Sequence, residues 1–310
     1  MGDAVAVGVD VGATKLLAVT VASDGTALER QRRTSPRRDP AALVAAVRDA
    51  ARELGTGLPV GVGAAGIVSR DGVLRYGPNL EVSDLPLRSR LSDDLAVPVV
   101  VANDATVALY GELRAGAARG ARDVVMLTLG TGVGGAIVVE GRLVYGAGGM
   151  AGELGHIIVA DGGRRCPCGN RGCLEAYASG TAIGARAAEL LAGSDEPTSL
   201  RDADPLDGRA VTLAALGGDR LGQRILREAG YWLGVGLTGI VNALDPELVV
   251  VGGGAAPTAA PYLLPAAAEV VSERLLGREH RTLPPMVLAT LADDAGAIGA
   301  GLLAAEEGGA

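Results

Sequence analysis

Aromatic side chains are almost missing from this sequence. They make up 2% of the 310 residues, and phenylalanine is absent altogether. The hydrophobic core must therefore be built from Val, Leu, Ile and Ala, with the 48 glycines allowing tight packing. Hydrophobic residues still reach 48% and charged residues 21%, which is typical of a soluble globular protein. A chain of this length is expected to form about two domains.

Basic residues are also fewer than acidic ones, 28 against 36. The formal net charge is −8 and the pI is about 4.9. Nucleic acid and anionic membranes repel such a chain at long range, so we expect neither as a partner. Every cationic side chain but Lys15 is an arginine. A GC-rich coding bias would explain the arginines, which makes the one retained lysine a candidate for a position that needs a compact point charge.

Long hydrophobic runs are absent as well. The longest, residues 124–139, is short for a membrane span and rich in glycine. The first residues carry Asp3 and Asp10, where a secretory signal would have a basic stretch followed by an apolar one. We therefore expect a cytoplasmic protein.

Cysteine and histidine are rare, and they are concentrated in one place. All three cysteines lie between residues 166 and 173, and one of only two histidines precedes them. A reducing cytosol disfavours a disulfide between neighbours so close in sequence. Three thiolates and an imidazole form a complete tetrahedral ligand set for Zn²⁺. We predict one structural zinc ion per chain, in a zinc knuckle, held by His156, Cys166, Cys168 and Cys173; inert buried cysteines are the alternative.

One pattern of secondary structure occurs twice. The apolar run at residues 5–9 is followed by a glycine-threonine loop, a second strand-like run, a tight turn and a third run. The same order begins again at residue 124, and such an internal duplication suggests two related α/β domains. We predict an N-terminal domain over residues 1–120 and a C-terminal domain over 121–310. Whether the C-terminal helix packs back on the first domain stays open.

Helical periodicity appears between the strand-like runs. The spacing of apolar residues predicts a helix over residues 40–54. In the C-terminal third, helices are expected over residues 222–242, 261–276 and 296–305, and a short strand over 247–251. This alternation of helices and strands is typical of an α/β fold.

Three glycine-rich loops each follow an apolar strand. Glycine lets the backbone approach a ligand and turns N–H groups towards an anion, so such loops can hold phosphate. One such loop is more often a plain turn, but three favour a nucleoside triphosphate. Their spacing matches neither the Walker motif nor the dinucleotide fingerprint. Asp10, at the end of its strand, is suited to hold Mg²⁺ through water. The candidate nucleotide-binding residues are Asp10, Gly12, Ala13, Thr14, Lys15, Gly130, Thr131, Gly132, Gly252, Gly253 and Gly254.

Two polar residues follow the apolar strand over residues 97–101. Asn103 and Asp104 stand where open α/β sheets place ligands. Asp104 is a candidate general base for an attacking alcohol, with Asn103 orienting that alcohol. The pair is explained equally well as the N-cap of a helix over residues 105–113. The local pattern does not decide between the two.

Two carboxylates flank the predicted zinc site. Glu153 lies three residues before His156, and Glu175 lies two residues after Cys173. A zinc knuckle would hold both carboxylates at one place, where they are good acceptors for vicinal hydroxyls. His156 could donate a hydrogen bond from the ring nitrogen that does not bind the metal.

Taken together, these motifs resemble the ROK family (repressors, open reading frames, sugar kinases), and within it the bacterial glucokinases. The resemblance runs from Asp10 to about Leu303. Its most specific part is Glu153-x-Gly-His156 followed by Cys166-x-Cys168-Gly-x-x-Gly-Cys173-x-Glu175. It implies a two-domain actin-like (ribonuclease H-like) α/β fold, which agrees with the internal duplication.

The resemblance assigns a role to each motif. Residues 10–15 look like the first phosphate motif of the family, residues 129–135 like the second, and residues 251–254 like the adenosine-side loop. Ala13 and Ala136 stand where the family often has glycine. Asp104 falls on the catalytic base. The sugar contacts fall on Gly66, Asn79, Asn103, Asp104, Glu153, His156 and Glu175.

The activity implied is ATP-dependent phosphorylation of glucose, with Mg²⁺ accompanying ATP and a homo-oligomer, a dimer or a tetramer, as the assembly. Kinases for N-acylmannosamine, fructose or allose share the scaffold and are the alternatives. The family also contains sugar-responsive repressors with an added N-terminal helix-turn-helix domain. Here the phosphate motif begins at Asp10, and both Asp104 and Lys15 are present, so a kinase is expected.

Overall fold

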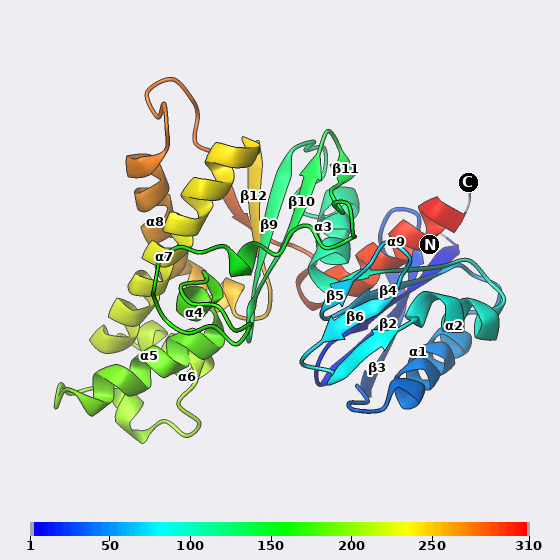
Figure 1. Cartoon of the computed structure of the whole chain (residues 1–310), viewed down its shortest axis with the longest axis horizontal. Coiled ribbons are helices and arrows are strands. Elements are labelled where there is room, and N and C mark those ends of the chain that lie inside the picture. Colours follow the sequence, from blue (N-terminus) through cyan, green and yellow to red (C-terminus); the bar gives the residue numbers. More distant parts are fainter. Residues whose placement is uncertain (1–2, 309–310) are drawn as a thin grey trace. The chain divides into compact units, whose positions relative to one another are not determined.

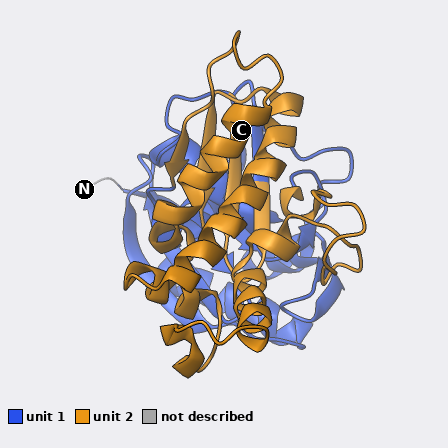
Figure 2. Ribbon diagram, turned by 90° about the vertical axis from the view of Figure 1, so that its left-hand side faces the viewer, with its two compact units in different colours: residues 1–122, 136–152, 289–310 blue, residues 123–135, 153–288 orange. Residues whose placement is uncertain are grey.

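The structure is a computed structural model, and it describes residues 3–308. The described chain divides into two compact units (Figure 2). Unit 1 contains residues 3–122, 136–152 and 289–308, and unit 2 contains residues 123–135 and 153–288. The domains predicted over 1–120 and 121–310 stay a prediction about folding units. In the structure, residues 136–152 and the C-terminal helix are counted with unit 1.

Unit 1 is built on a five-stranded sheet with the order β3-β2-β1-β4-β8. Strands β2, β3 and β4 of this sheet are labelled in Figure 1. The first three strands form an antiparallel meander, and the last two run parallel to β1. Their bounds are Ala4–Val11 for β1, Lys15–Ala22 for β2, Ala27–Thr34 for β3, Val60–Ala64 for β4 and Val99–Asn103 for β8. A small sheet of β5 (Ile67–Val68), β6 (Leu74–Gly77) and β7 (Val82–Leu85) follows β4 in the chain.

Helices cover both faces of this sheet because neighbouring residues of each strand point to opposite sides. Helices α1 (Pro40–Leu54) and α2 (Leu87–Leu95) contribute to one core, and α3 (Asp104–Ala115) and α9 (Ala295–Gly308) to the other. The bounds of α1 agree with the predicted helix, and the side chain of Asp39 caps its N-terminus.

Glycine allows α9 to lie directly against the sheet and α3. A Cβ atom on Gly8 of β1 would lie 1.8 Å from the carbonyl oxygen of Ala297. A Cβ atom on Gly299 would lie 1.8 Å from the carbonyl oxygen of Val107. No side chain fits at either position, which confirms the predicted packing through glycine.

The second sheet repeats the order of the first. Its strand order is β11-β10-β9-β12-β13, and β12 runs parallel to both β9 and β13. The two sheets therefore share the arrangement that the predicted internal duplication implies. The chain crosses from unit 2 to unit 1 inside β10, after Gly135. The bounds are Val124–Leu129 for β9, Val133–Val139 for β10, Arg142–Leu143 for β11, Leu248–Gly252 for β12 and Met286–Leu288 for β13.

Helices α7 and α8 pack against each other in unit 2 (Figure 1). Helix α8 begins at Ala256, five residues before the predicted start at residue 261. The prediction took Pro261 as the first helical residue, but Pro257 is the proline at the start of the helix, directly after Ala256, and Pro261 and Pro265 lie inside it. The helices of unit 2 are α4 (Glu175–Ala178), α5 (Gly180–Ala192), α6 (Gly208–Leu216), α7 (Arg220–Leu244) and α8 (Ala256–Arg274).

Three short 3₁₀ helices complete the secondary structure of the described residues: η1 (Leu154–His156), η2 (Ser199–Asp202) and η3 (Ala292–Asp294). Within residues 3–308, none of the helices combines the length and the hydropathy that crossing a membrane would require.

Candidate functional site

Three parallel strands of unit 1 end beside one another, and the predicted polar residues lie at these ends. Strand register pairs Asp10 of β1 with Gly63 of β4, and Ala64 of β4 with Asn103 of β8. The pKa of Asp10 is raised to about 7, mainly by burial and then by the negative charge of Asp104, with the charge of Lys15 opposing the rise. The structure therefore brings Asp10, Asp104 and Lys15 into one electrostatic neighbourhood.

The helix cap at α3 is Asn103, not Asp104. The Oδ1 atom of Asn103 accepts hydrogen bonds from the backbone N–H groups of Ala105 and Thr106, at 2.9 and 3.1 Å. Asp104 is the first residue of the helix, and its Oδ1 accepts from Ala105 at 2.9 Å. Because Asn103 already caps the helix, capping no longer explains why a carboxylate stands at position 104.

The amide of Asn103 also fixes Gly66. Its Nδ2 donates to the carbonyl oxygen of Gly66 at 3.0 Å, which uses one of its two hydrogens. Gly66 has a φ of +140°, and a Cβ atom there would lie 2.3 Å from the carbonyl oxygen of Tyr76. Asn79 lies in the exposed turn between β6 and β7. Among the predicted sugar contacts of unit 1, the hydrogen bonds thus join Asn103 to Gly66.

The first glycine loop is a tight turn that presents Lys15. The N–H of Gly12 donates to the carbonyl oxygen of Lys15 at 3.0 Å, and the N–H of Ser35 donates to the carbonyl oxygen of Thr14 at 3.2 Å. The Lys15 ammonium lies 2.8 Å from a carboxylate oxygen of Asp293. The lone lysine is therefore held between strand β2 and η3, at the start of α9.

In unit 2, the second glycine loop is bonded to the helices that follow the cysteines. The N–H of Gly180 donates to the carbonyl oxygen of Gly130 at 2.8 Å. The hydroxyl of Thr181 donates to the carbonyl oxygen of Thr131, also at 2.8 Å. A Cβ atom on Gly132 would lie 2.4 Å from Oε2 of Glu175, so only glycine lets that carboxylate reach the loop.

The third glycine loop lies beside the second. Strand register pairs Gly252 with Thr128, and the N–H of Ala255 donates to the carbonyl oxygen of Leu129 at 3.2 Å. Gly253 has a φ of +88°, and a Cβ atom there would lie 2.3 Å from the same carbonyl oxygen. Both predicted nucleotide loops of unit 2 therefore meet at one edge of its sheet.

The four predicted zinc ligands converge in unit 2. Their ligand atoms all lie within 4.8 Å of one another. The Sγ of Cys166 lies 3.8 Å from Nδ1 of His156, and the Sγ atoms of Cys168 and Cys173 are 3.6 Å apart. Tetrahedral zinc bonds of about 2.0–2.3 Å place ligand atoms roughly 3.3–3.8 Å apart, a range that these two contacts match. The donor set of three thiols and an imidazole suits Zn²⁺, and the wider separations in the group would close around the ion.

Burial raises the pKa of the Cys166 and Cys173 thiols, so a cation is what would stabilise their thiolate forms. The ring nitrogen of His156 that contacts a cysteine is Nδ1.

The two carboxylates that flank the cysteines affect one another. Partial burial raises the pKa of Glu153, His156 lowers it and Glu175 raises it. Glu175 also lies 3.7 Å from the Sγ of Cys166. The structure therefore gathers Glu153, His156 and Glu175, the three sugar contacts predicted in unit 2, around the cysteine group.

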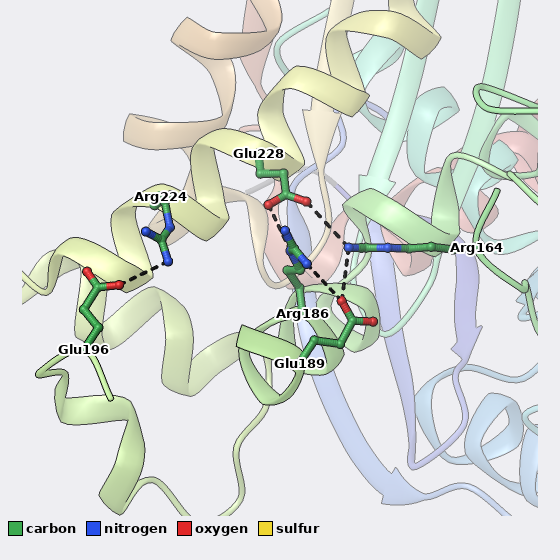
Figure 3. Close-up of polar contacts among 6 residues, drawn as sticks. All are labelled: Arg164, Arg186, Glu189, Glu196, Arg224 and Glu228. Carbon is green, nitrogen blue, oxygen red and sulfur yellow. Dashed lines mark hydrogen bonds and ion pairs between the residues drawn. The ribbon is translucent and has the colours of Figure 1, made fainter. Parts of the chain in front are cut away.

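A network of charged residues fastens the cysteine-rich loop to two helices (Figure 3). The guanidinium of Arg164 lies 3.4 Å from Glu189 of α5 and 3.5 Å from Glu228 of α7, and Arg186 contacts both carboxylates. A separate pair in Figure 3 joins Arg224 to Glu196. The hydroxyl of Tyr177 accepts a hydrogen bond from the backbone N–H of Arg164 at 2.8 Å.

Three residues that contact elements of the candidate site were not predicted from the sequence: Glu112, Tyr177 and Asp293. Glu112 is fully buried and accepts hydrogen bonds from Ala117, Thr290 and Leu291. A glutamate inside an otherwise apolar stretch of helix was the available signal, but its partners lie up to 179 residues away.

Comparison with known proteins agrees with this geometry. Residues 6–307 match the model of the ROK family. The chain belongs to the ROK family. Its α/β fold matches solved ROK sugar-kinase structures, in agreement with a two-domain actin-like architecture.

Several known proteins resemble nearly the whole chain. A glucokinase of Halalkalibacterium halodurans is 34% identical, over 99% of this chain and 97% of its own length. A glucokinase of Streptomyces coelicolor is 34% identical, over 97% of each chain. The crystal structure of a ROK family glucokinase from Streptomyces griseus in complex with glucose and AMPPNP is 34% identical, covers 97% of this chain and 99% of its own, and has a TM-score of 0.85.

Proposed function

We propose that this ROK protein is a glucokinase, which transfers the γ-phosphoryl group of ATP to glucose. The observation that carries the proposal is the full-length similarity to glucokinases, one of which was crystallised with glucose and an ATP analogue. The sites of the two units agree with it. Unit 1 supplies a carboxylate and the lone lysine, and unit 2 supplies two glycine loops and carboxylates suited to sugar hydroxyls.

Asp104 is the general base in this proposal. Its carboxylate takes the proton of the glucose 6-hydroxyl as that oxygen forms a bond to the γ-phosphorus, and the bond from phosphorus to the bridging oxygen of ADP breaks. The capping by Asn103 supports this role, because it leaves Asp104 at the first turn of α3 with no need to serve as the cap. Glucose 6-phosphate and ADP are the products.

Charge on the transferring group is balanced by this chain's own donors. We assign the phosphates to the loops around Gly12–Lys15 and Gly130–Gly132, and the adenosine side to Gly252–Gly254. Lys15 supplies a point charge. Asp10 would hold the Mg²⁺ that accompanies ATP, and that ion would neutralise phosphate charge.

Sugar binding is assigned to residues of both units. In unit 2, Glu153 and Glu175 accept hydrogen bonds from hydroxyls, and His156 donates from Nε2. In unit 1, Asn103, Gly66 and Asn79 provide the remaining contacts. We further propose that the cysteine group binds one structural Zn²⁺ through Nδ1 of His156 and the three thiolates, which keeps these side chains in place. That the protein is a homo-oligomer stays a prediction.

The test is a coupled assay of ADP release with a panel of sugars and Mg-ATP. Glucose should give the highest kcat/KM, and glucose 6-phosphate should be identified as the product. A higher kcat/KM for N-acetylmannosamine, fructose or allose would retain the kinase and overturn the choice of glucose. ADP release that is independent of every sugar would contradict the kinase itself.

A further inference from the structure

The Lys15 ammonium and the Asp293 carboxylate form an ion pair across 278 residues of sequence. The Nζ and Oδ2 atoms are 2.8 Å apart, and Arg32 of β3 approaches the same oxygen at 3.7 Å. Both side chains are about half exposed, at 40% for Lys15 and 57% for Asp293. An exposed pair of this kind adds little to stability, so stability alone gives no reason for its position.

Asp293 stands on a firmly held element. The two residues before η3 are bonded to the buried carboxylate of Glu112, at 3.1 Å from the N–H of Thr290 and 2.8 Å from that of Leu291. Ala292, directly before Asp293, has a φ of +50°, which is an unfavourable conformation for alanine. A left-handed alanine persists where the surrounding contacts determine the backbone, and here Glu112 supplies those contacts.

The neighbouring residue has a different partner. Asp294 accepts two hydrogen bonds from the guanidinium of Arg30, at 2.8 and 3.0 Å. Arg30 lies on β3 opposite Val19, and Arg32 lies opposite Leu17. Asp294 therefore holds the strand hairpin, whereas Asp293 is the residue that reaches the lysine of the phosphate loop.

A free lysine side chain is among the most flexible in a protein, and fixing it when a ligand binds reduces affinity. An ammonium that is already oriented avoids that loss. From this geometry we propose that Asp293 is a positioning residue, which orients Lys15 towards the triphosphate of ATP. The inference rests on the proposed function, since it assigns Lys15 to ATP.

Asp293 could also have the opposite effect on nucleotide affinity. A carboxylate beside Lys15 repels phosphate, and if this repulsion dominated, removing Asp293 would strengthen nucleotide binding. The direction of the change in ATP affinity therefore distinguishes positioning from competition.

The experiment compares Asp293→Asn with Asp294→Asn, a matched change one residue away. At saturating glucose, Asp293→Asn should raise the KM for Mg-ATP about three- to fivefold, the upper range for an exposed ion pair, with kcat within about twofold. Asp294→Asn should leave both within about twofold, and Asp293→Glu should restore most of the loss. Combined with Lys15→Ala, Asp293→Asn should have no further effect on the KM. An unchanged or lowered KM in Asp293→Asn, or an effect that persists without Lys15, would overturn the proposal.

Calorimetry with Mg-AMPPNP provides a measurement that does not need catalysis. Asp293→Asn should weaken this binding by the same about three- to fivefold, and glucose binding without nucleotide should stay unchanged. If the wild-type protein bound Mg-AMPPNP but did not phosphorylate glucose, the proposed function would fail while this comparison still decided the role of Asp293. If a variant at 293 did not fold, Asp293→Ser serves the same comparison.

Discussion

The carboxylate of Glu175 accepts a hydrogen bond from the backbone N–H of Val133 at 2.9 Å. Glu175 follows the cysteine group, and Val133 ends the second glycine loop, so one carboxylate touches two motifs that are 42 residues apart. The predicted sugar contact is therefore also a support of the predicted phosphate loop. Substitutions at this residue should affect both substrates.

Two substitutions at Glu175 should separate these roles. Glu175→Gln keeps an oxygen that can accept from Val133 and weakens only the acceptor for sugar hydroxyls, so the KM for glucose should rise more than the KM for ATP. Glu175→Ala leaves the N–H of Val133 unpaired, at a cost of about 1–3 kcal/mol, and both constants should rise. Steady-state kinetics with each substrate varied in turn measures the split. If both substitutions changed the KM for ATP equally, the hydrogen bond to Val133 would have no role in ATP binding.

Asp104→Asn tests the general base. The amide keeps the size of the side chain and an oxygen that can accept from Ala105, and Asn103 still caps α3. An amide cannot take the proton, so kcat should fall by at least about 10²-fold. Glucose affinity, measured by calorimetry without ATP, should change far less, and the thermal midpoint should stay near that of the wild type. A loss of turnover below about tenfold in the folded variant would place the base elsewhere.

The cysteine group should contain metal. Elemental analysis is expected to find about one zinc per chain. Cys168→Ser and His156→Asn should lose both zinc and glucose affinity, because the metal keeps Glu153 and Glu175 in place. His280→Asn is the matched control, since His280 is exposed and lies outside the group. Full glucose binding in a zinc-free protein would show that the metal and the sugar site are independent.

Asp219 should make stability depend on pH. It caps α7 and accepts hydrogen bonds from Gly222, Thr198 and Ser199. Burial raises its pKa, but these bonds outweigh burial and lower it from 3.8 to about 2. A depressed pKa contributes stability that is complete above the unfolded value and is lost as the pH falls from 3.8 through about 2.

The measurement is urea unfolding of the wild type and of Asp219→Asn over a series of pH values. Near neutral pH the variant should be less stable by about 1 kcal/mol, because a neutral amide accepts weaker hydrogen bonds than a carboxylate. The difference should shrink as the pH falls below about 4. A difference that is the same at every pH would mean that Asp219 acts through packing and not through its charge.

Much of the candidate site was predictable because its signals are local. His156 and the three cysteines fall within 18 residues, so spacing alone indicated a metal group, and the structure brings their ligand atoms together. The helix over Pro40–Leu54 was predicted from periodicity, and the repeated order of strands and loops indicated two related sheets. Each of these features depends on residues that are neighbours along the chain.

What the sequence by itself determined is therefore the set of motifs and the duplicated α/β pattern, since the periodicity and spacing of side chains follow from local backbone geometry. That Asn103 and not Asp104 caps α3 is a local choice, made through bonds to Ala105 and Thr106 that the Asn-Asp pattern left open. Tertiary structure alone decided that Glu112 holds the backbone before η3 and that Lys15 meets Asp293. The physical reason is that such contacts depend on which strands become neighbours and on how α9 returns to β1, and the local pattern of side chains carries no record of partners that are more than 170 residues away.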